Sequence, residues 1–263
     1  MTTLTNEALL AVADRLGVQT LPLVLAAGPR QDTFEAWKAA RDDAVARLEA
    51  DGTFDGYGDV EPGLADALHT LTQPEAELSG RCYSADGVLR ICLARRGVRH
   101  ATAIRTGDSF DIAAPGIDGS DRELARLLLA ALPACPPAEV AAASVAAEDL
   151  ARRLDAARTP TDYVDAMYAL GIDAHDATVL GTAFGTCHGY TEIVATVHHD
   201  GLTSRAPGAV AVYDTARGRI VVAPTTAPDG LVWSTITPGT DHRLTQAVGA
   251  LLEGLPGGRW LPD

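Results

Sequence analysis

The sequence predicts an α+β fold in which a central antiparallel sheet is flanked by helical bundles. Two observations support this prediction. Several strand-like segments follow one another between helix-like segments, which indicates hairpins rather than parallel β-α-β crossovers. Two stretches of sequence also occur twice, in the same order. We therefore expect one domain over residues 1–263, built from two αβα halves related by a pseudo-two-fold axis, about 1–135 and 145–263.

The repeats are short but ordered. Residues 8–18 resemble 162–172, and residues 119–124 resemble 239–244. Each member of the second pair begins a helix-like run that ends in Leu-Pro. The first pair lies farther apart than the second, so the first half holds additional residues, which we assign to a helix at 33–51 and its loops. Chance similarity between Ala/Leu-rich helices is the alternative explanation.

Capping residues and hydrophobic spacing predict the elements of the first half. Thr33 can cap the second helix, and Ser120-Asp121-Arg122-Glu123 fits a capping box. The predicted order is a helix at 6–16, a short strand at 21–25, helices at 33–51 and through Leu64 to Leu71, strands at 76–83, 88–95, 97–105 and 109–114, and a helix from Ser120.

A segment rich in proline and alanine, residues 133–146, separates the halves as an internal linker. Thr159-Pro160-Thr161-Asp162 supplies an N-cap, a first-turn proline and an acid at a helix start. The predicted order of the second half is helices at 147–157, 159–170 and 173–184, strands at 189–199, 208–214, 218–224 and 231–237, and a last helix capped by Thr240.

Charge and composition exclude several classes of function. The formal net charge of −14 repels phosphate backbones and anionic lipid surfaces, so we expect no nucleic-acid partner. No apolar run reaches the roughly 18 residues of a membrane span, and no basic segment precedes the first apolar stretch, as a secretory signal requires. We therefore expect a cytoplasmic protein without membrane insertion.

The four cysteines form no C-x-x-C pair, which argues against a structural zinc site. Cys82 and Cys92 flank a predicted hairpin turn at Asp86-Gly87. In that register Cys82 faces Ile91, so the two cysteines point to opposite faces of the sheet and cannot form a disulfide. We expect buried free thiols.

Motifs for chemistry are absent from the sequence: there is no P-loop, dinucleotide-binding, H-E-x-x-H or G-x-S-x-G pattern. His198 and His199 are strand neighbours that face opposite sides, so they cannot chelate one metal together. Cys187 and His188 lack an evident third group to orient a base. We therefore predict no catalytic residues, no metal and no cofactor. The spacing of Gly181, Gly185 and Gly189 permits either a close helix contact or a ligand loop, but a helix followed by the start of a strand is the favoured explanation.

Resemblance to a known family extends this interpretation. The resemblance rests on six segments: Arg15-Leu16-Gly17, Leu21-Pro22, residues 60–68, residues 209–219 with a D-T-x-x-G-R hairpin, residues 229–235 with a W-x-T strand, and Pro238-Gly239. In this order and spacing the chain resembles the EspG family of ESX (type VII) secretion-associated proteins of actinobacteria. The resemblance covers nearly the whole chain.

The resemblance implies a chaperone rather than an enzyme. Members of the family bind an apolar tip on the PPE protein of PE–PPE pairs in the cytosol, keep the pair soluble and deliver it to an ESX secretion system. Exposed apolar tips self-associate, and a strongly acidic partner that covers them raises solubility. The alternatives are a small-molecule-binding or hydrolytic α+β domain, which needs a pocket with convergent polar groups, and a structural component of a homodimer. A weak homodimer is compatible with the chaperone.

The resemblance places the partner surface at about residues 159–199. Alternation along the strand at 189–199 puts Thr191, Ile193, Ala195 and Val197 on one face, which is small and apolar and should face the core. The other face mixes aromatic, charged and polar groups, which suits an interface. The expected docking residues are Tyr190, Glu192, Val194 and Thr196, with Phe184 and His188 near the edge. The alternative is that the protein's own helices cover this face.

Overall fold

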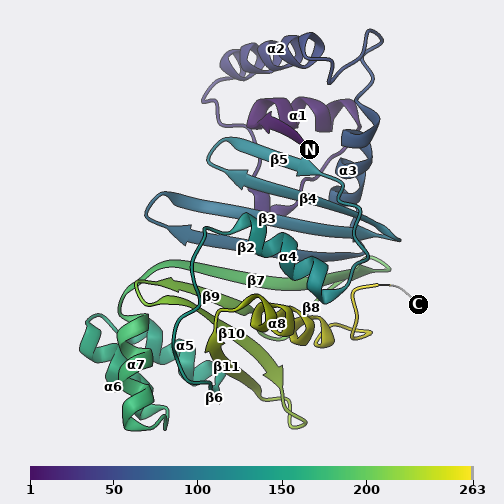
Figure 1. The fold of residues 1–263 in the computed structure, drawn as a ribbon. Coiled ribbons are helices and arrows are strands. Elements are labelled where there is room, and N and C mark those ends of the chain that lie inside the picture. The colour runs from purple at the N-terminus through teal and green to yellow at the C-terminus, as the bar shows by residue number, and fades with distance from the viewer. Residues whose placement is uncertain (262–263) are drawn as a thin grey trace.

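An eleven-stranded antiparallel sheet runs through the computed structural model, which describes residues 1–261 (Figure 1). The strand order is β1-β5-β4-β3-β2-β7-β9-β10-β11-β6, and β8 pairs with the end of β7. The predicted α+β class with a central antiparallel sheet is therefore confirmed. The two strands at its centre, β2 and β7, come from different halves of the sequence.

The first half contains all elements up to residue 131. They are β1 (Thr2–Thr5), α1 (Asn6–Arg15), the 3-10 helix η1 (Leu23–Leu25), α2 (Phe34–Ala50), α3 (Pro62–Thr72), β2 (Ala76–Ser84), β3 (Gly87–Arg96), β4 (Arg99–Thr106), β5 (Ser109–Ala113) and α4 (Asp121–Ala131).

The second half begins at residue 143 with a short edge strand. Its elements are β6 (Ala143–Ala146), α5 (Ala147–Ala156), α6 (Pro160–Ala169), α7 (Ala174–Phe184), β7 (Cys187–His199), β8 (Leu202–Arg205), β9 (Val210–Thr215), β10 (Gly218–Thr226), β11 (Val232–Pro238) and α8 (Asp241–Glu253).

Most predicted helix starts coincide with side-chain caps. Thr33 accepts a hydrogen bond from the backbone of Ala36, and Thr159 and Asp162 form a reciprocal capping box. Ser120 caps α4, but Glu123 pairs with Arg126 instead of completing the predicted box.

The predicted strand at 21–25 is wrong, because this segment forms η1, and sequence patterns did not predict β1, β6 or β8. The β2–β3 turn also lies one residue earlier than predicted, so Cys82 faces Leu89 rather than Ile91. Cys82 and Cys92 nevertheless lie in different core clusters on opposite faces of the sheet, as buried free thiols.

From the centre of the sheet outward, the first half contributes β2, β3, β4, β5 and β1, and the second half contributes β7, β9, β10, β11 and β6. In each half the first strand in the sequence, β1 or β6, forms the edge and pairs with the last strand, β5 or β11. This topology agrees with a duplicated unit, although superposition of the halves stays a prediction. One detail of the repeat is wrong: α5, and not α6, follows the edge strand as α1 does. Over residues 1–261, three α-helices precede the hairpins in each half, so α2 is not an unmatched insertion.

Helices are distributed unevenly over the two faces of the sheet. Helices α4 and α8 pack against each other over the central strands, and we call this side the α4/α8 face (Figure 1). On the opposite face, α1 and α3 pack on the outer strands β3 to β5, with α2 outside α1, and α5 to α7 pack on β9 to β11 and β6. Three hydrophobic clusters, one under each group of helices, form the core.

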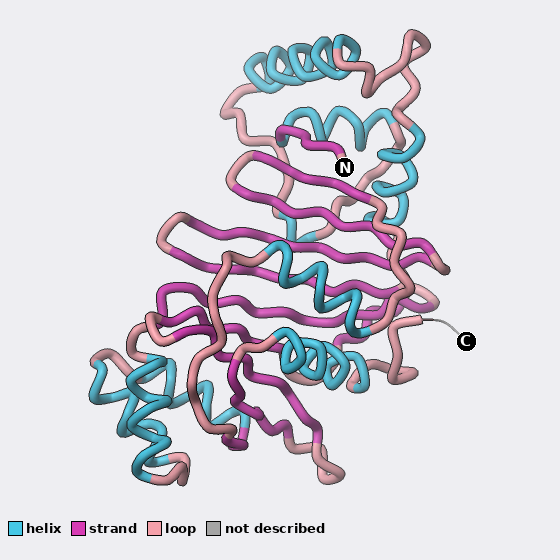
Figure 2. Tube along the Cα trace, viewed as in Figure 1, coloured by secondary structure: helices cyan, strands magenta, loops and turns pink. Residues whose placement is uncertain are grey.

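The linker between the halves is fixed by a buried ion pair. The linker crosses from α4 to β6 as a long loop (Figure 2). The Arg219 guanidinium donates to both carboxylate oxygens of Asp214, at 2.6 and 2.9 Å, and to the carbonyl of Pro133 at 2.6 Å. The Arg219 backbone also bonds to Pro136 and Ala138. Burial lowers the pKa of Arg219, but the hydrogen bond and charge of Asp214 outweigh burial and raise it overall.

Helices α6 and α7 approach each other closely at Gly181. A Cβ atom built there would lie 2.4 Å from Cα of Val164, which is a backbone atom and cannot move aside easily. Gly185 ends α7 and also lies close to α6, because a Cβ atom on it would lie 3.3 Å from Cα of Pro160. The close helix contact, together with the helix-to-strand transition, therefore explains the glycine spacing.

We predict that Gly181→Ala lowers the free energy of unfolding by about 1–3 kcal/mol through overpacking. An alanine in a helix interior normally stabilises by about 1 kcal/mol, so the sign of the change is diagnostic. Urea unfolding measures it. Gly56→Ala, at a loop position with no atom within 4 Å of the added Cβ, is the control. A stability equal to or above that of the unsubstituted chain would contradict the close contact.

We predict that Asp214→Ala destabilises the protein by about 3–5 kcal/mol, because it leaves the buried Arg219 guanidinium without its carboxylate. Thermal unfolding followed by circular dichroism measures this effect. Asp42→Ala removes an exposed ion pair with Lys38 and should cost about 0–1 kcal/mol. Replacing both buried partners, as Asp214→Leu with Arg219→Met, should recover much of the lost stability. If the single and double variants lose the same stability, the unpaired charge is not the cause.

Candidate functional site: an open strip of the sheet

A strip of the opposite face, between the two groups of helices, keeps its side chains partly exposed. It belongs to β2 and β7, which pair in register from Ala76 opposite Val197 to Ser84 opposite Gly189. We call this surface the open strip. Its members are Glu77, Ser79, Arg81 and Tyr83 of β2 and Tyr190, Glu192, Val194 and Thr196 of β7.

The two faces of β7 differ in burial. Thr191, Ile193 and Ala195 are buried on the α4/α8 face, and Val197 packs against the same cluster. The other alternating set, Tyr190 to Thr196, is half-buried on the opposite face. The four predicted docking residues therefore lie together on one surface, and the alternate set faces the core, as the strand alternation predicts.

Four aromatic rings connect the core to the surface of the open strip. Phe184 is buried, and its ring contacts Tyr213 edge-on at 5.0 Å. Tyr213 contacts Tyr190 at 5.0 Å, and Tyr190 stacks with Tyr83 at 6.2 Å. Tyr83 is 42% exposed and ends the series at the surface. Phe184 therefore lies buried beside the strip, in the cluster under α5 to α7, rather than lining it.

Burial sets the protonation state of these tyrosines. It raises the pKa of Tyr190 to about 12, with a smaller contribution from the charge of Glu192. It also raises the pKa of Tyr213, with a contribution from Tyr190. Both phenols are neutral at physiological pH, so the rings present apolar area with a hydroxyl and no charge. Such amphipathic rings are common at protein interfaces.

Charged groups lie beside the rings. Arg81 is directly opposite Glu192 on the neighbouring strand, and the Glu192 carboxylate lies 3.7 Å from the guanidinium of Arg205 on β8. His188 is exposed at the start of β7, next to the aromatic end of the strip. The open strip thus combines aromatic and aliphatic area with a few charges, which is the composition of a protein-binding surface.

Sequence reasoning did not find the contribution of β2 and β9. Tyr83, Arg81 and Tyr213 join the predicted residues only because β2 and β9 flank β7. Strand alternation predicts that Ser79, Arg81 and Tyr83 share one face of β2, but no local sequence pattern indicates which strand pairs with β2.

Other residues considered for chemistry are engaged elsewhere. Partial burial raises the pKa of the Cys187 thiol, which disfavours the reactive thiolate. His198 bonds to Thr203 and His199 contacts Asp200, so the two histidines do not converge. Within residues 1–261, no group of three or more His, Cys, Asp and Glu side chains is placed to hold a metal ion. Over the same residues, no helix combines the length and apolar character needed to cross a membrane.

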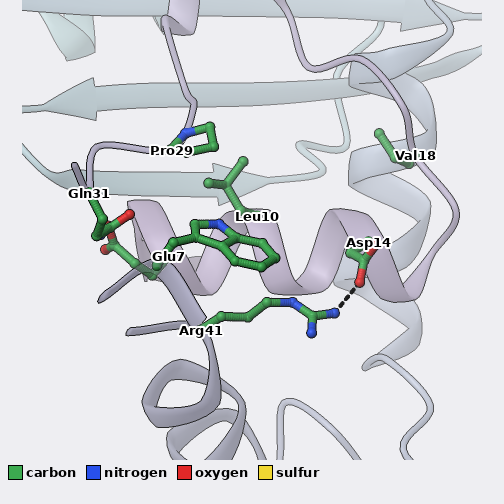
Figure 3. Close-up of a pocket in the computed structure, with 8 residues that line it drawn as sticks. Glu7, Leu10, Asp14, Val18, Pro29, Gln31 and Arg41 are labelled. Carbon is green, nitrogen blue, oxygen red and sulfur yellow. Dashed lines mark hydrogen bonds and ion pairs between the residues drawn. The ribbon is translucent and has the colours of Figure 1, made fainter. Parts of the chain in front are cut away.

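A separate cavity of about 370 Å³ lies between α1 and α2 (Figure 3). Arg41 reaches across it to form an ion pair with Asp14, and Gln31 donates to Glu7 at 2.9 Å. Burial raises the pKa of Glu7, but the hydrogen bond from Gln31 and other donors lower it overall. The charged groups that line this cavity are thus bonded within it rather than directed at a ligand.

Several secretion-associated proteins match this chain over almost its whole length. The chain is 32% identical to the ESX-1 secretion-associated protein EspG1 of Mycobacterium tuberculosis, covering 98% of this chain and 88% of the relative. It is 31% identical to the ESX-3 secretion-associated protein EspG3 of Mycolicibacterium smegmatis, covering 99% and 89%.

A solved structure of the Mycobacterium tuberculosis type VII secretion system chaperone EspG5, in complex with the PE25-PPE41 dimer, has the same fold. The TM-score is 0.82 at 18% identity, with 98% of both chains covered. The family model described as "EspG family" matches residues 5–250. The chain therefore belongs to the EspG family.

Proposed function

We propose that this protein is a cytosolic, non-enzymatic chaperone that binds the apolar tip of the PPE protein in PE–PPE pairs. It keeps the pair soluble and delivers it to a type VII secretion system. The open strip carries the proposal, because it is a partly exposed aromatic and aliphatic surface at the centre of the sheet. Family membership and the shared fold with a chaperone solved in complex with a PE25-PPE41 dimer support it.

The physical chemistry of the chain fits this role. A partner's apolar tip loses its tendency to self-associate once the open strip covers it. The net charge of −14 on this chain then adds negative charge to the complex, which opposes aggregation. A ligand-binding or hydrolytic domain would need a pocket such as the cavity between α1 and α2, but Asp14 there is already paired with Arg41 and Glu7 already accepts a hydrogen bond from Gln31.

In this proposal Tyr190, Glu192, Val194 and Thr196 line the docking surface, as the sequence predicts, and Tyr83 extends it. Phe184 packs against Tyr213 at the buried end of the series of rings, and His188 lies at the border. A central aromatic group that packs against neighbouring rings and is exposed at one end is typical of residues that dominate binding energy.

We predict that Val194→Lys weakens binding to a PE–PPE pair by about 30-fold or more while the melting temperature is retained. Val194 is half-buried at the surface, so the lysine stem can lie along the strip while its ammonium group remains in water. The charge would then have to be desolvated when an apolar tip docks. Calorimetric titration with purified PE–PPE pairs measures the affinity, and circular dichroism measures the melting temperature.

Leu231→Lys is the matched control, since Leu231 is an apolar residue that is 60% exposed outside the open strip. It should leave binding unchanged. If Val194→Lys unfolds the protein, or if it binds as the unsubstituted chain does, the assignment of the docking surface is wrong.

A further inference from the structure

Three arginines form a row across neighbouring strands at the border of the open strip. Arg81 on β2 is directly opposite Arg90 on β3, and Arg90 is directly opposite Arg105 on β4. Like charges in directly opposite positions destabilise a sheet. Within residues 1–261 none of the three forms a salt bridge. Other interactions must therefore offset the repulsion between these arginines.

Two members of the row hold η1 against the sheet. Arg90 donates to the carbonyl of Val24 at 3.1 Å, and Arg105 donates to the carbonyls of Leu25 and Ala26 at 2.7 and 2.6 Å. Carbonyls at a helix end lack intrahelical partners and carry partial negative charge, so guanidinium groups stabilise them. Ala26, which ends η1, has a left-handed backbone with φ of 48°, a strained conformation that the arginine contacts help to maintain.

The result of this arrangement is a firmly held but exposed leucine. Leu23 is 92% exposed, although Pro22, Val24 and Leu25 around it are buried. Its side chain contributes little to the stability of the free chain. Because η1 packs on β2 and β3, Leu23 is presented beside the open strip on a fixed turn. Ordering such a residue on binding costs little entropy.

The positive charge of the row is only partly offset. Burial lowers the pKa of Arg105, and the neighbouring charges of Arg30 and Arg90 lower it further. Arg81 donates no hydrogen bond to the described chain, and its half-exposed side chain belongs to the open strip. On a protein with a net charge of −14, this border is a local basic site next to apolar area.

We propose that Leu23 and Arg81 form a second contact region of the docking surface, which receives a partner tip that carries a carboxylate beside its apolar side chains. This inference rests on the proposed function and identifies the chemistry of the partner's tip. Leu23 contributes apolar contact, and Arg81 pairs with the carboxylate. The region is continuous with the strip, because Arg81 and Tyr83 lie opposite Glu192 and Tyr190. Charge complementarity selects an acidic tip over a basic one.

Binding of purified PE–PPE pairs to two variants tests the proposal. Leu23→Ser should weaken the affinity by about 10-fold or more, as loss of a contact residue does, with no change in melting temperature. Arg81→Glu should weaken it by about 10-fold or more at about 50 mM NaCl, and the loss should shrink at about 500 mM NaCl because salt screens exposed charges. The effect of Leu23→Ser should be independent of salt. Amide exchange in residues 23–26 should slow when the pair binds.

Matched controls separate this inference from the proposed function. Leu231→Ser removes an exposed leucine elsewhere, and Arg122→Glu makes the same charge change on α4, on the other face; both should bind as the unsubstituted chain does. If Val194→Lys abolishes binding but Leu23→Ser and Arg81→Glu do not weaken it, this inference is overturned and the proposed function stands. If the unsubstituted chain binds no PE–PPE pair, both are overturned.

Discussion

The pairing of β2 with β7 is the interaction on which the rest of this structure depends. Nine consecutive residue pairs join the two halves into one sheet, from Ala76 opposite Val197 to Ser84 opposite Gly189. This register also assembles the open strip, because it places Tyr83 beside Tyr190 and Arg81 beside Glu192. A slip of one residue would exchange every outward side chain with a core side chain, so the packing of the core and the composition of the open strip depend on the same register.

The distribution of helices explains why this surface remains accessible. Helices α4 and α8 cover the central strands on one face, whereas on the other face the helices pack over the outer strands. The linker between the halves begins at the end of α4, where Arg219 donates to the carbonyl of Pro133, and its residues Ala138 and Val140 then pack in the cluster under α5 to α7. The sheet thus gains one continuous core at its centre while the opposite face keeps the open strip.

Charge is organised on two scales. Over the whole chain the negative excess opposes aggregation, which is compatible with the proposed function. At the border of the open strip, a row of arginines holds η1 and leaves Arg81 and Leu23 facing outward. Under the proposed function, a locally basic border on an acidic protein would attract an acidic tip while the overall negative charge still opposes aggregation.

The sequence by itself determined the α+β class, the order of most elements, the helix caps at Thr33, Thr159 and Thr240, and the alternation that puts Tyr190 and Val194 on one face. These features follow from local hydrogen bonds and from hydrophobic period. Only the tertiary structure decided that β2 lies beside β7, that the four-residue segments β1 and β6 are strands, and that η1 presents Leu23. Those features arise from hydrogen bonds and packing between residues far apart in the chain, for which a local pattern carries no signal.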